Sequence, residues 1–383
     1  MYLESVETRA FRNLRDGAVR LDPGVNLVLG GNGQGKTNFL EAITVLGTLR
    51  SFRTPNPRRL VRHGERRFIL RGALRAGGLT RELAQEVSFE PSPRRRLLLD
   101  GDPAPPQEYL RAIRVEVLTG RREDLVLGEP RIRRAFLDRL VFDLHPAAFE
   151  LLRTYRRLLD QRNAWLRAGG DPGEGRVWES RLAREGARVV VARRRAVARL
   201  ESVFAGLLEE VGRGRLPDVG LAYRSESWLP QDAEAGELAE KYEMMYHSAR
   251  ERDGRLGFTG FGPHRHDLFL TVDGRAASES LSAGQARLVA ALLRLAAVEL
   301  VESETAFEGP GIVVMDDADA ELDREAFGAL LERVGRDRQV ILSSPRQETV
   351  RDAVSAGAVF RVRDGAVLPW TAMETTNDGQ VHR

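Results

Sequence analysis

The chain of 383 residues contains no cysteine, which excludes a disulfide-stabilised scaffold and a metal site built from thiolates. It also has no uncharged apolar run near the roughly 20 residues that a membrane-spanning helix needs. Its N-terminal stretch lacks the apolar core of a secretory signal. From these absences we expect a cytoplasmic protein without a membrane partner.

The chain also has little net charge, because 59 basic and 56 acidic residues leave a formal charge of only +3. Binding of a polyanion therefore cannot rest on overall charge, and any basic surface has to be a local patch. Lysine is nearly absent, since Lys36 and Lys241 are the only lysines among the 59 basic residues. The hydrophobic share of 42% is that of a folded chain, and its length favours two domains.

Short apolar runs of the β type occupy both ends of the chain, whereas helical spacing occupies the middle. The strand-like runs lie at 3–6, 19–21, 25–29, 67–74, 96–99, 268–272, 312–315 and 340–342. Between about residues 130 and 211, apolar residues recur at the i, i+3, i+4 spacing of a helix.

This pattern predicts an α/β fold, namely a P-loop ATPase head of the ABC/SMC type with an inserted, mostly helical lobe. We expect residues 1–120 and 258–383 to form the head and residues 121–257 to form the lobe. The composition of residues 371–383, approximately, predicts a flexible tail.

A glycine-rich loop carries the strongest chemical signal and matches the pattern G-x-x-x-x-G-K-[ST]. Its residues are Gly30, Gly31, Asn32, Gly33, Gln34, Gly35, Lys36 and Thr37. An apolar run precedes the loop and a helical pattern follows it, which is the context the motif requires. Backbone N–H groups of such a loop and the helix N-terminus bind phosphates. We therefore predict that the loop binds ATP, with Lys36 near the β- and γ-phosphates and Thr37 as a ligand of Mg²⁺. A glycine turn before an ordinary helix is the alternative.

Two carboxylates, Asp316 and Asp317, directly follow the apolar run 312–315. In a P-loop fold such a strand lies beside the loop, which places Asp316 at Mg²⁺ and Asp317 near the attacking water. Lys36, Asp316 and Asp317 are thus the predicted catalytic residues. Aspartate is one methylene shorter than glutamate, so we expect slow hydrolysis. Acidic residues after an apolar run also occur as simple strand-end caps.

The sequence L-S-A-G-Q at 281–285 opens a predicted helix with Ser282 as its N-cap. In ATPases of the ABC class, an S-x-G-Q motif also binds the γ-phosphate of ATP held by a second subunit, a role that suits a helix N-terminus. Ser282, Gly284 and Gln285 are therefore predicted to complete the site of a partner copy. Asp323 lies where ABC proteins have their D-loop, and we count it with these residues.

Spacing separates the subclasses of these ATPases. About 245 residues lie between Thr37 and Ser282, more than in transport ATPases. The helical insert shows no sustained heptads and is too short for the long coiled-coil arm of SMC proteins.

Six further motifs together resemble the RecF family of bacterial recombination-mediator ATPases. They are F-R-N-L at 11–14, S-F-R-T at 51–54, L-V-R-H-G at 60–64, R-R-A-F-L-D at 133–138, L-D-Q-R-N at 159–163 and G-P-H-R-H-D-L at 262–268. The resemblance implies ATP-dependent dimerisation on DNA, and partnership with RecR and RecO in loading RecA at gapped DNA. We add Arg12, Asn13 and Asn38 to the predicted nucleotide-binding residues.

Two points stay open, and the first is a departure from the family pattern. The last core strand is followed by Ser343-Ser344-Pro345, without the switch histidine of ABC ATPases, and Ser344 is a candidate to approach the γ-phosphate. His264 and Arg265 either support the structure or sense the nucleotide.

Residues 121–213 contain 20 arginines and 14 acidic residues, a local basic excess. Arg153, Arg156 and Arg157 share one helical face, and Arg193, Arg194 and Arg195 follow on the next helix. Such side chains suit contacts with single- or double-stranded DNA through phosphates, without sequence preference. A solvated helix face in an arginine-rich protein is the alternative.

The leading hypothesis is a weak, DNA-dependent ATPase that dimerises on ATP and closes on DNA. An ABC-type transport ATPase subunit is a second possibility, which the long helical insert disfavours. A scaffold protein with structural ATP is a third.

Overall fold

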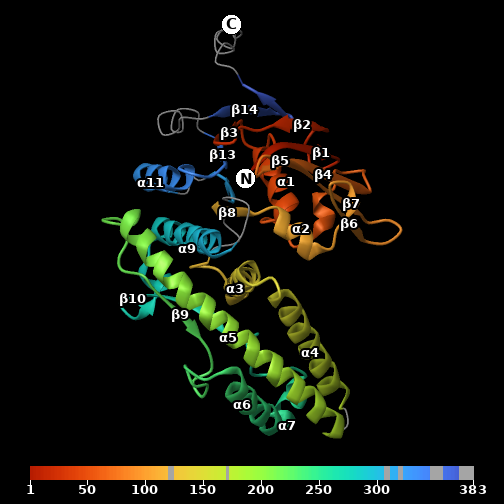
Figure 1. Ribbon diagram of the computed structural model, residues 1–383, viewed down its shortest axis with the longest axis vertical. Helices are drawn as coiled ribbons and strands as arrows, with labels where there is room; N and C mark the ends of the chain where they lie inside the picture. Colours follow the sequence, from red (N-terminus) through yellow and green to blue (C-terminus); the bar gives the residue numbers. More distant parts are fainter. Residues whose placement is uncertain (120–124, 170–171, 306–310, 318–321, 346–356, 371–383) are drawn as a thin grey trace. The chain divides into compact units, whose positions relative to one another are not determined.

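The computed structural model describes residues 1–119, 125–169, 172–305, 311–317, 322–345 and 357–370 (Figure 1). The chain forms two compact units, which we call the head and the lobe. The head comprises Met1–Asp124, Leu207–Leu216 and Ser282–Arg383, and the lobe comprises Leu125–Gly206 and Pro217–Leu281. Among the described helices, none combines the length and the apolar character needed to cross a membrane.

One six-stranded sheet of the head is parallel except for its edge strand β15. Its strands are, in sheet order, β15 (Ala366–Pro369), β14 (Ala358–Arg363), β3 (Val25–Leu29), β13 (Val340–Ser344), β12 (Ile312–Met315) and β8 (Val115–Thr119). All residues of β12 and β13 are buried. Continuous burial explains why these strands read as unbroken apolar runs, as is typical of parallel sheets covered on both faces.

The second six-stranded sheet of the head is antiparallel. Its strands are, in sheet order, β2 (Gly17–Arg20), β1 (Tyr2–Arg9), β4 (Arg67–Ala76), β5 (Leu79–Ser88), β6 (Arg94–Leu99) and β7 (Asp102–Pro103). Burial alternates along β4, where Phe68, Leu70 and Leu74 are inward and Arg67 and Arg71 are exposed. One face of this sheet therefore packs on the core and the other faces solvent.

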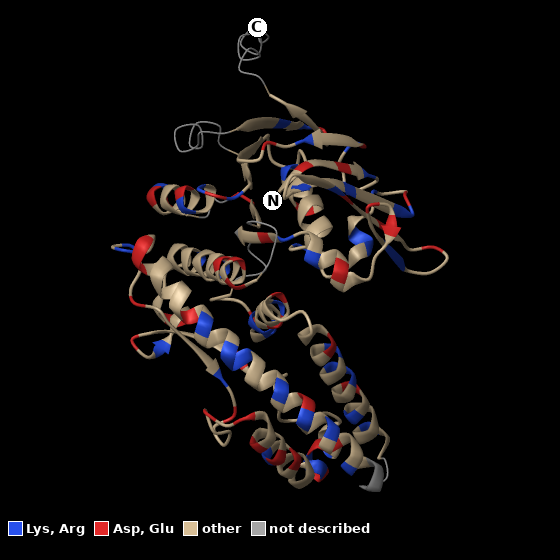
Figure 2. Ribbon diagram, viewed as in Figure 1, with Lys and Arg blue, Asp and Glu red and all other residues tan. Residues whose placement is uncertain are grey.

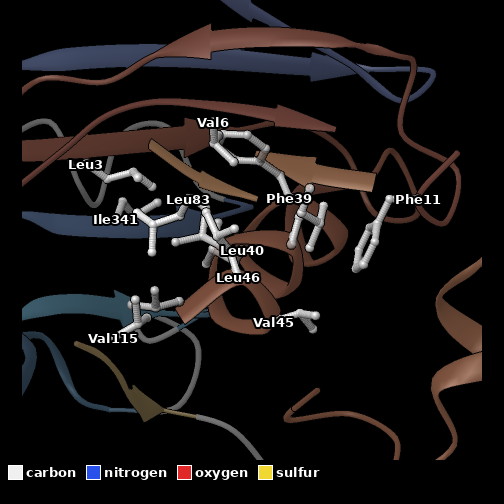
Figure 3. Close-up of a cluster of buried hydrophobic side chains, with 14 of the residues drawn as sticks. Leu3, Val6, Phe11, Phe39, Leu40, Val45, Leu46, Leu83, Val115 and Ile341 are labelled. Carbon is white, nitrogen blue, oxygen red and sulfur yellow. The ribbon is translucent and has the colours of Figure 1, made fainter. Parts of the chain in front are cut away.

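Helix α1 (Lys36–Thr48) packs in the core that joins the two sheets. Figure 3 shows its side chains Leu40 and Leu46 among residues of both sheets, such as Leu83 and Ile341. Gly47 permits close contact with β8, because a Cβ atom there would lie 2.2 Å from Cγ2 of Val115. The other described helices of the head are η1 (Pro57–Leu60), α2 (Pro106–Ala112), α9 (Ala283–Glu304) and α11 (Arg324–Gly335).

The lobe is mostly helical, with one small antiparallel sheet. Its helices are α3 (Pro130–Leu144), α4 (Ala148–Ala168), α5 (Pro172–Glu210), α6 (Ala235–Ser248), α7 (Arg250–Leu256) and α8 (Ala277–Ser280). The sheet consists of β11 (Arg275–Ala276), β10 (Asp267–Val272) and β9 (Gly220–Arg224). From Leu207 onward, the end of α5 belongs to the head.

The lobe extends further along the chain than the sequence predicted. It ends at Leu281 rather than at residue 257, because β10 pairs with β9, with Leu268 opposite Tyr223. Segment Leu207–Leu216 joins the head because Glu210 accepts a hydrogen bond from Arg333 at 3.0 Å. The start of the predicted lobe, 121–124, and the predicted tail, 371–383, lie outside the described residues.

The motif at 262–268 forms a polar cluster inside the lobe. The ring of His264 is hydrogen-bonded through Nδ1 to the Tyr155 hydroxyl at 2.7 Å and through Nε2 to the Thr259 carbonyl at 3.0 Å. His266 is buried, and its Nδ1 lies 2.6 Å from the Tyr223 hydroxyl. Every one of these partners belongs to the lobe, so both histidines have a structural role here.

Burial lowers the pKa of His264 to about 4, below the ordinary value of 6.5. Burial also lowers the pKa of His266, although the hydrogen bond to Glu226 opposes that change. Both imidazoles are therefore neutral in the folded lobe near pH 7.

We expect the lobe to lose stability as the pH falls from about 6.5 to about 4. In this window an unfolded histidine binds a proton and the folded His264 does not, so protonation favours unfolding. His264 alone accounts for a loss on the order of 3 kcal/mol. Thermal unfolding between pH 4 and 8 measures the effect. His264→Gln should flatten the dependence, whereas His63→Gln, at an exposed position, should leave it unchanged. Equal slopes in both variants would contradict the assignment.

Candidate nucleotide-binding site

The glycine-rich loop lies between the end of β3 and the start of α1, as its motif requires (Figure 1). Gly35 has a φ of 122°, a backbone region that favours glycine. Gly30 is in close contact with the neighbouring strand β14, because a Cβ there would lie 2.6 Å from the Val362 carbonyl oxygen. The local backbone geometry and packing therefore explain why both positions are glycine.

Lys36 is the first residue of α1, and it is buried, with an exposed fraction of 5%. Its Nζ donates hydrogen bonds to the carbonyl oxygens of Gly30 at 2.8 Å and Gly31 at 3.3 Å. The ammonium group thus lies within the loop, beside the N-terminus of the helix. Loop amides, helix dipole and Lys36 together favour an anion at this point.

A hairpin from the far end of the chain supports the loop. The turn between β14 and β15 donates two backbone N–H groups to Gln34, from Asp364 to its side-chain oxygen at 2.7 Å and from Gly365 to its carbonyl at 3.0 Å. The sequence predicted no role for these hairpin residues. The Asp-Gly pair between two short apolar runs is a hairpin signal, but nothing in it indicates contact with residue 34.

The predicted metal ligands meet at the same edge of the parallel sheet. Oγ1 of Thr37 donates to Oδ1 of Asp316 at 3.1 Å. They meet because β3 and β12 flank β13 in parallel, so their carboxyl ends lie at one edge. A hydroxyl and a carboxylate are hard oxygen donors, so the residues present fit Mg²⁺. Burial raises the pKa of Asp316, and the charge of Asp317 acts in the same direction; a bound cation would favour the ionised form.

Ser343, at the end of β13, joins the two aspartates. Its hydroxyl donates to Oδ1 of Asp316 at 2.7 Å and accepts the N–H of Asp317 at 3.0 Å. Ser343 is fully buried, and Asp317 has a φ of 47°, which is uncommon for a residue other than glycine. The sequence did not single out Ser343. Its neighbour Ser344, the candidate to approach the γ-phosphate, is also buried, and that role stays a prediction. Neighbouring strand residues point to opposite faces, and the face that holds the carboxylates was not evident from sequence.

Arg12, Asn13 and Asn38 surround the loop and the first turns of α1. Arg12 donates two hydrogen bonds of 2.9 Å to Glu41, a fully buried carboxylate of α1. Asn38 donates to Oδ1 of Asn13 at 2.6 Å, and Asn13 donates to the Gly33 carbonyl at 3.3 Å. These contacts position the loop, and direct contact with a nucleotide stays a prediction.

Ser282 forms a complete capping box at the start of α9. Its hydroxyl accepts the N–H of Gln285 at 3.3 Å, and the Gln285 side chain accepts the N–H of Ser282 at 3.0 Å. Ser282 and Gly284 are exposed. Among the described residues, no hydrogen bond or ion pair joins this motif to the glycine-rich loop of the same chain. The motif is therefore a helix cap that faces outward from its own head.

Asp323 caps α11, because its Oδ1 accepts the N–H of Ala326 at 2.8 Å. This is the ordinary role of an aspartate at that position. Its neighbour Glu321 lies outside the described residues, so the predicted D-loop is described only in part.

The prediction that Arg193 contacts DNA is wrong. This residue is 3% exposed, and its guanidinium donates to Asp138 at 2.6 Å and to the Pro263 carbonyl at 2.6 Å. Consecutive helix positions lie about 100° apart, so a run of three arginines cannot share one face. Arg193 points inward, whereas Arg195 is exposed.

The remaining predicted DNA contacts are on the lobe, where both basic and acidic residues occur along α4 and α5 (Figure 2). Arg153, Arg156 and Arg157 are exposed on α4. Arg153 forms an ion pair with Glu150 at 2.7 Å. Arg194 is half-buried and donates to the Gln231 carbonyl at 2.8 Å. Their contact with DNA stays a prediction.

Known proteins resemble the chain along nearly all of its length. A family model described as the RecF/RecN/SMC N-terminal domain matches residues 2–367. A curated protein of Geobacter sulfurreducens, described as DNA replication and repair protein RecF, is 32% identical over 373 residues, which cover 96% of this chain and 100% of that protein. A protein of the same description from an Anaeromyxobacter species is 35% identical over 376 residues, with 96% and 99% covered.

Solved structures show the same fold. The structure of the recombination mediator protein RecF with ATP has a TM-score of 0.86 at 24% identity, covering 97% of this chain and 98% of that chain. An SMC head bound to the winged-helix domain of ScpA has a TM-score of 0.54 at 15% identity, with 98% and 99% covered. The predicted fold, an ABC/SMC-type ATPase head with an inserted, mostly helical lobe, is confirmed.

We expect Ser343→Ala to slow ATP hydrolysis about tenfold or more while changing ATP affinity by less than about threefold. The variant removes a buried hydrogen bond to a carboxylate, which contributes about 1.5–3 kcal/mol. Steady-state turnover and equilibrium binding of a fluorescent ATP analogue measure the two effects. Ser343→Thr should restore turnover because it keeps the hydroxyl. Ser303→Ala is the control, because it removes a serine hydroxyl of α9 that donates only to the Leu300 carbonyl. Equal loss in both alanine variants would contradict this role of Ser343.

Proposed function

The chain belongs to the RecF/RecN/SMC family, and on this premise we propose that it is an ATP-dependent, DNA-binding recombination mediator. In this proposal, ATP closes a homodimer on DNA at gaps or single-strand/double-strand junctions. The dimer helps to load a RecA-type recombinase during DNA repair. Slow hydrolysis then releases the complex, which makes the protein a weak, DNA-dependent ATPase.

The observation that carries the proposal is the contact between Thr37 and Asp316 at 3.1 Å. Thr37 directly follows Lys36, whose ammonium group is hydrogen-bonded to the loop at Gly30. It brings a phosphate-binding loop and a cation-binding carboxylate together from opposite ends of the chain. Mg²⁺ held by these two oxygens would neutralise phosphate charge during transfer. The RecF structures with ATP and with an ATP analogue support ATP as the nucleotide.

Hydrolysis in this proposal depends on the chain's own residues in three roles. The loop amides and Lys36 bind the phosphates and stabilise the charge that develops on them. Asp317 orients the attacking water. The Ser343 hydroxyl holds both aspartates, because it accepts the backbone N–H of Asp317 and donates to the carboxylate of Asp316. The short side chain of Asp317 is the reason for slow turnover.

The exposed capping box supports the dimer in this proposal. Ser282 and Gly284 are exposed, and the first amides of a helix have no backbone partners within it. A γ-phosphate bound by one copy would satisfy these amides on the other. Each ATP is then held by two chains, so nucleotide binding is linked to assembly.

The partners in this proposal are DNA, bound without sequence preference, and mediator proteins of the RecR and RecO type. Support comes from the curated relatives, described as DNA replication and repair proteins, and from the solved mediator assigned to the RecFOR pathway. A cytoplasmic location belongs to the same proposal.

We expect Lys36→Met to weaken ATP binding about 10- to 100-fold, as the loss of charge-assisted hydrogen bonds predicts. Isothermal titration with ATP and Mg²⁺ measures the affinity. Lys241→Met is a matched control, because it makes the same change at the only other lysine. An unchanged affinity in Lys36→Met would refute the assignment of the loop.

We expect Ser282→Arg to abolish ATP-dependent dimers and leave ATP affinity within about threefold. The arginine side chain would occupy the space in front of the helix N-terminus where the partner's phosphate binds. Sedimentation velocity with ATP measures the dimer. All compared proteins also carry Asp317→Asn, because slower hydrolysis preserves the ATP-bound dimer during the measurement. Ser278→Arg, at another exposed position, is the control. Dimers that persist in Ser282→Arg would favour a scaffold with structural ATP.

A further inference from the structure

The turn between β14 and β15 consists of two residues, Asp364 and Gly365. Both have a positive φ, of 48° and 77°, as in the tightest hairpin turns. Strand β14 pairs in parallel with β3, the strand that leads into the glycine-rich loop (Figure 1). Because parallel strands end at the same edge of a sheet, the turn that follows β14 lies beside the loop that follows β3.

Val362, a buried residue near the end of β14, lies against both ends of the loop. A Cβ atom on Gly30 would lie 2.6 Å from the Val362 carbonyl oxygen, which leaves no room for a side chain. A Cβ atom on Gly35 would lie 3.5 Å from Cγ1 of Val362. One residue of β14 therefore borders both the first and the last glycine of the loop.

Gln34 joins the loop to the turn through two hydrogen bonds. The N–H of Asp364 donates to its side-chain oxygen at 2.7 Å, and the N–H of Gly365 donates to its carbonyl oxygen at 3.0 Å. The peptide unit between Gln34 and Gly35 is trans, and in a trans unit the C=O and N–H groups point in opposite directions. The N–H of Gly35 therefore points away from the turn, which leaves this amide to a phosphate.

The other side of the turn is enclosed as well. The N–H of Arg15 donates to the Gly365 carbonyl at 2.8 Å, and Nε of Arg15 donates to the Asp364 carbonyl at 3.2 Å. A Cβ atom on Gly365 would lie 2.0 Å from the carbonyl oxygen of Asn13. The turn is thus held between the loop and residues 13–15, and even a methyl group on Gly365 would displace it.

The loop needs such support because four of its eight residues are glycine. Glycine permits the backbone conformations of the loop, but it also loses the most conformational freedom when it becomes ordered. A loop that had to be ordered by its ligand would bind that ligand more weakly than a loop already held in place. The contacts with β14 and the turn come from the protein itself, so they order the loop independently of nucleotide.

We propose that Val362, Asp364 and Gly365 are positioning residues of the nucleotide site, which order the glycine-rich loop for phosphate binding. This inference rests on the proposed function, from which it takes the nucleotide as ligand. The alternative is an ordinary sheet edge whose contact with the loop has no effect on binding. A positioning role raises KM and leaves kcat unchanged, because it acts on binding and not on the hydrolysis step. A sheet edge affects only the stability of the head.

The test compares Gly365→Ala with Gly101→Ala. Both glycines are the second residue of an Asp-Gly turn and have a positive φ, 77° and 90°, so alanine introduces similar backbone strain. Their surroundings differ, because among the described residues only chain neighbours of Gly101 lie within 4 Å of a Cβ atom there.

Isothermal titration with ADP and Mg²⁺ measures binding to the loop alone, since ADP lacks the γ-phosphate that would link two copies. We expect the Kd for ADP to rise about tenfold or more in Gly365→Ala and less than about threefold in Gly101→Ala. In steady-state turnover of Gly365→Ala, KM for ATP should rise by a similar factor and kcat should stay within about twofold.

Equal ADP affinities in the two alanine variants would overturn this inference, as would a loss of kcat with unchanged ADP affinity. Either result leaves the proposed function intact. A wild-type protein that binds neither ADP nor ATP would overturn both.

Val362→Ala replaces Gly365→Ala if thermal unfolding shows that the glycine variant does not fold. It removes the side chain that borders Gly35, and we expect the Kd for ADP to rise about threefold or more. Val334→Ala is its control, because it removes the same atoms from a buried position of α11. Equal ADP affinities in these two variants would overturn the inference.

Discussion

The burial of α1 between the two head sheets is the constraint on which the rest of the structure depends. The helix carries Lys36 and Thr37 in its first turn, and its sides pack against strands from both ends of the chain. Gly47 brings its last turn into contact with Val115 on β8. Because close-packed cores resist displacement, the position of the phosphate loop is set by the core rather than by the loop itself.

Contacts of long sequence separation then complete the site. Ser343 joins the two aspartates, and the turn at Asp364 and Gly365 holds Gln34. Each of these partners comes from the last tenth or so of the described chain, whereas the loop lies near its start. A parallel sheet produces this outcome, since it collects the carboxyl ends of distant strands at one edge.

Pairing, rather than abundance, decides which arginines carry free charge. The lobe is rich in arginine, yet Arg193 is buried against Asp138 and Arg153 is paired with Glu150. Buried charges need partners because desolvation is costly.

The sequence by itself determined the elements and the chemistry that depend on local order. The loop at 30–37, the apolar runs that became β3 and β12, and the capping box at Ser282 were all predictable, because periodicity and N-cap chemistry are local properties. Only the tertiary structure decided that Ser343 reaches the aspartates, that the lobe extends to Leu281, and which arginines face solvent. Those outcomes depend on strand register and on which face is buried, and both are fixed by residues tens to hundreds of positions away.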